Sequence, residues 1–166
     1  VKYTGDNIGK PISATNIHNY MESRKEDISK NIVLSYLKAT SAAYLINEVE
    51  RYNIPGKRLL ETNSKYYFGD VGIRNFVVGG RRVNDIEKIL ENLVYQHLVR
   101  LGYKVNVGVL YNAEIDFVCS RGDDVRYVQV AYLIHDDDTL RREFGNLLQI
   151  KDNNQKYVIS MTPYME

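Results

Sequence analysis

The stretch NAEIDFVCSRGDDVRYVQVAY, residues 112–132, indicates how the second half of the chain folds. It holds two apolar runs on either side of a Gly-Asp-Asp turn, a pattern typical of two antiparallel strands joined as a hairpin. Because residues two apart in a strand share a face, Glu114 and Asp116 are expected to point the same way. Pairing through the turn would bring Asp116 close to Gln129 on the second strand.

The segments around this hairpin predict a sheet flanked by helices. Apolar residues recur on one face of residues 85–101, which predicts a helix that begins with a capping box at Asn84 and Glu87 and stops at Gly102. A strand is expected at residues 103–111, a helix capped by Thr139 at residues 140–150, and a strand at residues 156–161. The predicted order is therefore α-β-β-β-α-β.

The first half of the chain predicts short helices followed by a second hairpin. Ser13 and Ser29 are suitable caps for two helices, and two strand-like runs flank the Pro-Gly turn in NIPGKR. Helix, turn, helix and hairpin are the plan of a winged helix-turn-helix. The glycine-rich stretch after Asp70 suits a connector. We therefore expect an α+β protein with a winged helix over residues 1–70 and an α/β domain over residues 71–166.

Composition excludes several classes of protein. The 166 residues carry a net charge of +1, so any basic surface for nucleic acid must be local. A lone cysteine, Cys119, argues against a disulfide scaffold or a cysteine-rich zinc site and favours a reducing, cytoplasmic setting. Since no apolar run approaches the length of a membrane span, no membrane association is expected.

The second half resembles the PD-(D/E)XK nuclease-like superfamily, whose core has the order α-β-β-β-α-β. The resemblance rests on Glu91 in LENLVYQHL, Asp116 in EIDFV, and the strand VQVAY. In other members of the superfamily this strand carries an acid, any residue and then a lysine. It implies that Glu91 and Asp116 are metal ligands for Mg²⁺. Gln129 then stands where the family has its second acid, and Ala131 where it has the lysine.

Nearly the whole chain resembles the C-terminal region of bacterial and archaeal AAA-type ATPases that carry a winged helix followed by a nuclease-like domain of unknown function. The motifs LSYLKATSAAYLINEVERYNIPGKRLLETNSKYYFGDVGIRN, LENLVYQHLVRLGYKV, EIDFV and RREFGNLLQIKDNNQKYVIS carry this resemblance. It implies ATP binding only for an ATPase module upstream of this region. That module, and other copies of this chain in a homo-oligomer, are the partners that the resemblance implies.

The two replacements favour an inactive site. Alanine cannot orient the attacking water or stabilise charge on the phosphate, and glutamine is a weaker ligand for Mg²⁺ than a carboxylate. At roughly 3 kcal/mol for each lost group, the rate would fall by about four decades. Lys88, one turn before Glu91, is the only substitute amine that the sequence indicates. A divergent Mg²⁺-dependent DNA endonuclease therefore stays open as the alternative.

The winged helix leaves a second choice open. Lys30, Asn31 and Lys38 on the predicted recognition helix, with Lys57 and Arg58 at the wing, are candidate nucleic-acid-binding residues that would contact DNA phosphates. Residues 1–70 hold ten Lys and Arg against eight Asp and Glu, a net of only +2. Weak, sequence-tolerant DNA binding and protein docking or assembly both fit this charge.

Overall fold

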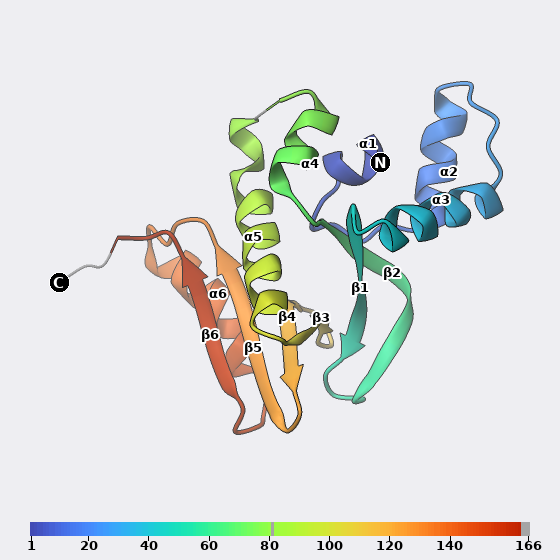
Figure 1. Ribbon diagram of the computed structural model, residues 1–166. Coiled ribbons are helices and arrows are strands. Elements are labelled where there is room, and N and C mark those ends of the chain that lie inside the picture. Colours follow the sequence, from blue (N-terminus) through green and yellow to red (C-terminus); the bar gives the residue numbers. More distant parts are fainter. Residues whose placement is uncertain (81, 164–166) are drawn as a thin grey trace.

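The structure, a computed structural model, describes residues 1–80 and 82–163. Within this part of the chain the strands form one mixed sheet with helices on both faces (Figure 1). The helices are α1 (Lys2–Asp6), α2 (Ala14–Ser23), α3 (Lys30–Ala42), α4 (Val71–Val78), α5 (Ile86–Arg100) and α6 (Asp137–Leu148). The strands are β1 (Ile46–Asn53), β2 (Arg58–Phe68), β3 (Lys104–Val109), β4 (Glu114–Arg121), β5 (Asp124–Ala131) and β6 (Gln155–Ser160).

The described strands lie in the order β2-β1-β3-β4-β5-β6. β1 and β2 form an antiparallel hairpin, and β1 pairs in parallel with β3. β3, β4 and β5 form an antiparallel meander, after which α6 provides the crossover that the parallel β5–β6 pair requires. The predicted order α-β-β-β-α-β is thus confirmed from α5 to β6.

Two apolar cores lie on opposite faces of this sheet. α5 covers the larger core, in which Leu98 packs with Val107 of β3 and Phe117 of β4. α6 covers the smaller core, where Leu147 packs with Ile115. Among the helices described, none is long and apolar enough to cross a bilayer.

The helices of the first half begin where their caps predict. Ser13 Oγ accepts the N–H of Asn16 at 3.1 Å, and Ser29 Oγ accepts the N–H of Ile32 at 3.4 Å. Both are typical N-cap bonds. The expected hairpin also forms, but β1 continues through its pairing with β3 into the strands of the second half. The strands of both halves therefore belong to one sheet.

The stretch expected to be a connector is the helix α4. Its N-terminus is capped by Asp70, whose Oδ1 accepts the N–H of Ile73 at 2.8 Å. It ends at Gly79, which adopts the left-handed conformation at φ 90°. The prediction was wrong because the flanking glycines, which here end and follow a helix, were interpreted as marks of a linker.

Two predicted caps in the second half were also wrong. Thr139 is not the cap of α6 but lies in its first turn, where its N–H is accepted by the true cap, Asp136, at 2.7 Å. α5 follows a short 3-10 turn and has no side-chain cap, so Asn84 forms no capping box. The carboxylate of Asp85, the residue just before α5, instead forms ion pairs with Arg74 and Lys88.

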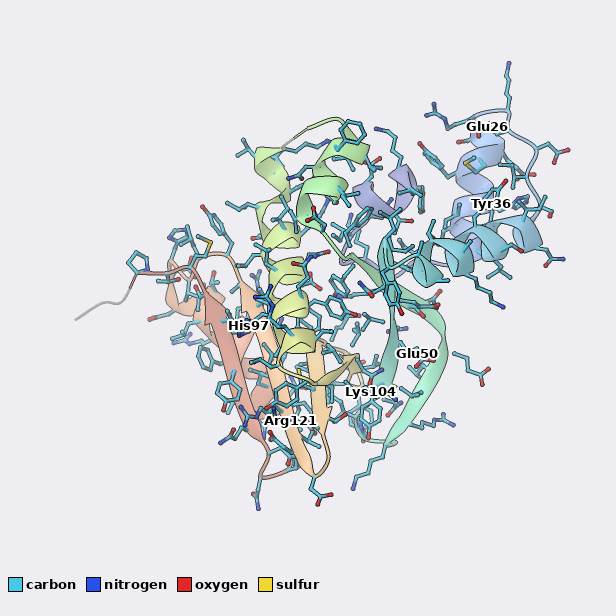
Figure 2. The ribbon with its side chains drawn as sticks, viewed as in Figure 1. Glu26, Tyr36, Glu50, His97, Lys104 and Arg121 are labelled. Atoms are coloured by element: carbon cyan, nitrogen blue, oxygen red, sulfur yellow. The ribbon has the colours of Figure 1, made fainter. Side chains whose placement is uncertain are left out.

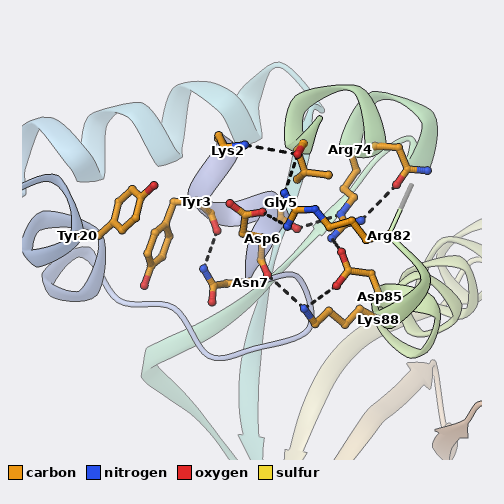
Figure 3. A network of polar contacts seen from close by, with 12 residues as sticks. Lys2, Tyr3, Gly5, Asp6, Asn7, Tyr20, Arg74, Arg82, Asp85 and Lys88 are labelled. Atoms are coloured by element: carbon orange, nitrogen blue, oxygen red, sulfur yellow. Dashed lines mark hydrogen bonds and ion pairs between the residues drawn. The ribbon is translucent and has the colours of Figure 1, made fainter. Parts of the chain in front are cut away.

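A buried ion-pair network joins α1 to α4 and α5 (Figure 3). Arg74 of α4 is fully buried, and its guanidinium donates to the Asp85 carboxylate and, at 3.0 Å, to the Gly5 carbonyl. Lys88 donates to the other Asp85 oxygen at 3.0 Å and to the Asp6 carbonyl at 3.4 Å. We call Arg74, Asp85 and Lys88 the Arg74 network.

Candidate functional site

Asp116 lies at an irregularity in the sheet. The register of β3 against β4 shifts there, so that Asp116 and Phe117 face a single residue of β3, which is the geometry of a β-bulge. The bulge breaks the expected alternation of faces, because Ile115 packs in the smaller core and Phe117 in the larger one. The Asp116 carboxylate reaches β5, where it accepts the N–H of Val130 at 2.8 Å.

The amine next to this carboxylate comes from β2. The Nζ atom of Lys65 lies 2.6 Å from Glu114 Oε1 and 3.3 Å from Glu91 Oε1. The side chain of Lys65 is 4% exposed, whereas those of Glu91 and Glu114 are 15% and 33% exposed, so the site opens to solvent beside Glu114. We call Lys65, Glu91, Glu114 and Asp116 the Lys65 cluster.

Neighbouring side chains hold Glu91 in position. Tyr67, which shares a face of β2 with Lys65, donates its hydroxyl to Glu91 Oε1 at 2.5 Å. The next residue of α5, Asn92, is fully buried and bonds both backbone groups of Phe68, accepting its N–H at 2.7 Å and donating to its carbonyl at 3.0 Å. These bonds fix α5 against β2 and so preset the separation of Lys65 from Glu91.

The charges of the cluster are unbalanced, with three carboxylates around one amine. Burial and the negative charge of Glu91 raise the pKa of Asp116 to about 7, against the opposing effects of Lys65 and the Val130 N–H. Burial by itself lowers the pKa of Lys65, but the charges of the three carboxylates outweigh it and raise that pKa. The amine therefore stays protonated, while Asp116 exchanges a proton near neutral pH.

Gln129 lies next to Asp116 but faces away from the cluster. Its Oε1 accepts the backbone N–H of Asp116 at 3.4 Å. Because Gln129 alternates on β5 with Val128 and Val130, which pack in the larger core, its side chain leaves the opposite face of the sheet. The structure thus brings together Glu91 and Asp116, and Gln129 touches them only through the backbone of Asp116.

Lys88 does not supply the missing amine, because Asp85 and the Asp6 carbonyl engage it in the Arg74 network. Sequence reasoning missed Lys65, which precedes Glu91 by 26 residues. One signal was available. Lys65 opens the apolar end of a predicted strand, KYYF, and a lysine in such a position needs a buried partner.

The cluster offers hard oxygen ligands and a cation. Mg²⁺ is usually bound through one or two carboxylates, with water and substrate phosphate completing its shell, and Glu91 and Asp116 are chemically suited to that role. Within the described residues no group of three or more His, Cys, Asp or Glu is arranged to hold a metal by itself. The remaining ligands would therefore have to come from water or substrate.

The residues expected to contact nucleic acid lie in two places. Lys30, Asn31 and Lys38 are exposed on α3, whereas Lys57 and Arg58 are exposed at the turn between β1 and β2. Figure 1 places α3 beside the start of β1 and the turn at its far end. The two groups do not form one patch.

Comparison with known proteins identifies relatives but no activity. Residues 1–84 match the family described as Domain of unknown function (DUF8612). An uncharacterized protein of Haemophilus influenzae is 36% identical over 160 residues, covering 96% of this chain and 39% of that protein. An uncharacterized protein of Methanocaldococcus jannaschii is 30% identical over 145 residues, covering 85% of this chain and 32% of that protein. The chain thus spans less than half of these curated relatives, and no solved structure matches it.

Proposed function

The chain belongs to the family of the domain of unknown function DUF8612, and we propose that its Lys65 cluster is a nuclease-like site that acts on DNA with a divalent cation. The observation that carries this proposal is the position of Lys65 Nζ, 3.3 Å from Glu91 and 2.6 Å from Glu114. Under this proposal residues 71–166 form a PD-(D/E)XK nuclease-like domain, and β2 contributes the lysine that β5 lacks.

Each member of the cluster has a role in this chemistry. Glu91 and Asp116 would hold Mg²⁺, which when bound polarises the phosphate and its attacking water. The protonated amine of Lys65 stabilises the negative charge that develops on the phosphate oxygens. Glu114, the more exposed glutamate, accepts the proton of the water. The rate loss of about four decades expected from the sequence assumed that both the lysine and one acid were missing. With Lys65 in the place of the lysine, only the effect of the missing acid remains.

The test is cleavage of plasmid and single-stranded DNA in Mg²⁺ and in Mn²⁺. Cleavage is expected to need the cation and to fall by about 100-fold or more in Lys65→Met and in Asp116→Asn. Lys88→Met removes the amine that the sequence had indicated and is the matched control, expected to retain activity within about threefold. Circular dichroism confirms that each variant is folded. A folded protein that does not cut DNA, or that cuts equally well without Lys65, would contradict the proposal.

A different observation favours a second function, a non-cutting, DNA-binding accessory region of an AAA-type ATPase. Both glutamates already neutralise Lys65, and β5 carries Gln129 and Ala131 at the family's acid and lysine positions. In this alternative α2, α3 and the β1–β2 hairpin act as a winged helix, and the ATPase module occupies other parts of a longer protein. Lys30→Ala with Lys38→Ala should then abolish DNA stimulation of ATP hydrolysis by that longer protein, with basal hydrolysis unchanged.

A further inference from the structure

A groove of about 740 Å³ lies on the sheet face opposite the Lys65 cluster. Its walls come from three segments far apart in sequence: the β1–β2 hairpin, β3 with the loop that follows it, and the connection from α6 to β6. Figure 2 shows Lys104, the first residue of β3, between the hairpin and β4. α6 packs on β4, β5 and β6, and the groove occupies the part of this face toward the hairpin.

The floor of the groove is apolar and its rim carries aromatic rings. Val118 of β4 and Ile150 after α6 are buried in the floor, beside the ring of Tyr127. Tyr111, in the turn between β3 and β4, is 87% exposed, although a large aromatic ring normally gains by burial. Tyr52 of β1 also lines the groove and is half-buried. The groove therefore offers flat apolar surface that the rest of the described chain does not cover.

The charge around the groove is positive. Lys57 in the hairpin turn, Lys104 on β3 and Lys151 after α6 are all exposed, and none forms an ion pair with a described residue. Among the lining residues described, the one carboxylate belongs to Asp152. It already accepts the Tyr127 hydroxyl at 2.6 Å and pairs with Lys156 at 3.3 Å, so it does not neutralise the three lysines.

From this arrangement we infer that the groove binds a segment of single-stranded DNA. Lysines from three elements converge on one concavity, where they complement the phosphates of a strand. Exposed tyrosine and an apolar floor suit the faces of unstacked bases, which a duplex hides within its stack. The inference does not depend on cleavage, because the groove shares no residue with the Lys65 cluster.

Binding of a fluorescent oligothymidine of about ten nucleotides, measured by anisotropy in EDTA, tests the inference. Lys104→Ala with Lys151→Ala is expected to weaken binding by about tenfold or more. It should also reduce the slope of log K against log salt by about 1.4, since each single-strand phosphate contact accounts for about 0.7. Tyr111→Ala should weaken binding by about tenfold with an unchanged salt slope, and Tyr111→Phe should bind like the parent.

Lys10→Ala with Lys25→Ala is the matched control, because it removes the same charge from exposed positions outside the groove. It is expected to change affinity by less than about twofold. Equal weakening by the two double variants, equal competition by blunt duplex DNA, or full affinity of Tyr111→Ala would overturn the inference. If the protein passes these binding tests but does not cut DNA, the inference that the groove binds single-stranded DNA is supported. Only the nuclease proposal is then refuted.

Discussion

Two buried ion-pair clusters meet neighbouring turns of α5, and they differ in their balance of charge. In the Arg74 network two cations, Arg74 and Lys88, share the single carboxylate of Asp85. In the Lys65 cluster one cation lies among three carboxylates. Burial does not separate them, since the side chains of Arg74 and Lys65 are 0% and 4% exposed. The difference lies in the number of partners for each charge.

The pKa values of the two aspartates follow this difference. Burial alone raises the pKa of Asp85, but hydrogen bonds and charges from Arg74 and Lys88 outweigh it and lower that pKa. For Asp116, burial and the charge of Glu91 together raise the pKa to about 7. The first network favours its charged form and stabilises the fold, whereas the second holds like charges together at a cost. Such a cost is typical of a site kept for binding or chemistry.

Breaking the Arg74 network should have the largest effect. Arg74→Met is expected to lower the free energy of unfolding by about 3–5 kcal/mol, because it leaves the Asp85 carboxylate buried with Lys88 alone. Urea denaturation at pH 7 measures the change. The double variant Arg74→Met with Asp85→Asn should lose less, since the buried carboxylate that had lost its Arg74 partner is then uncharged. Equal losses in the two variants would mean that packing of the Arg74 side chain, and not charge balance, holds α4 in place.

The elements predicted correctly are those with a local signal. Ser13 and Ser29 cap helices through bonds to residues three further on, and the apolar stripe of α5 repeats every turn. α4 has a local signal in its cap Asp70 and its C-terminal Gly79, but it was missed because the glycines around it were interpreted as a linker. Its buried anchor, Arg74, is recognisable only once Asp85 lies beside it. The single sheet was missed because the β1–β3 pairing joins strands about 50 residues apart.

The candidate site was predictable only in part. Glu91 and Asp116 were expected to share a location, and the structure brings them close enough for Glu91 to raise the pKa of Asp116. Lys65 was not foreseen, because its place depends on how the β1–β2 hairpin folds against α5. Gln129 was expected to approach Asp116, and its Oε1 does accept the backbone N–H of Asp116 at 3.4 Å, although its side chain lies on the sheet face opposite the Lys65 cluster.

Removing a charge from the unbalanced cluster should have the opposite sign and a smaller size. Asp116→Asn is expected to stabilise the fold by about 1–3 kcal/mol at pH 8 and to have a clearly smaller stabilising effect at pH 5. The folded pKa of about 7 exceeds the ordinary value of 3.8, so the fold favours the protonated form. Parent stability therefore falls as pH rises from about 4 to about 7, and the variant lacks that fall.

Urea denaturation between pH 5 and pH 8 measures this slope for the parent, for Asp116→Asn and for Asp123→Asn. Asp123 is exposed in the turn between β4 and β5, so its variant should keep the pH dependence of the parent. If Asp116→Asn destabilises the protein at pH 8, the carboxylate is held favourably, and the contrast between the two clusters disappears.

The smallest effect is expected at an exposed ion pair beside the Arg74 network. Arg82 pairs with Asp6 at 2.7 Å, a shorter distance than the 3.0 Å between Lys88 and Asp85, but its side chain is 45% exposed. Arg82→Gln should therefore cost only about 0.2–1 kcal/mol, since water and salt already screen the pair. Urea denaturation at low and at high salt measures it, and the difference from the parent should shrink as salt is added. A salt-independent loss as large as that of Arg74→Met would show that ion-pair geometry, and not burial, determines the strength of these ion pairs.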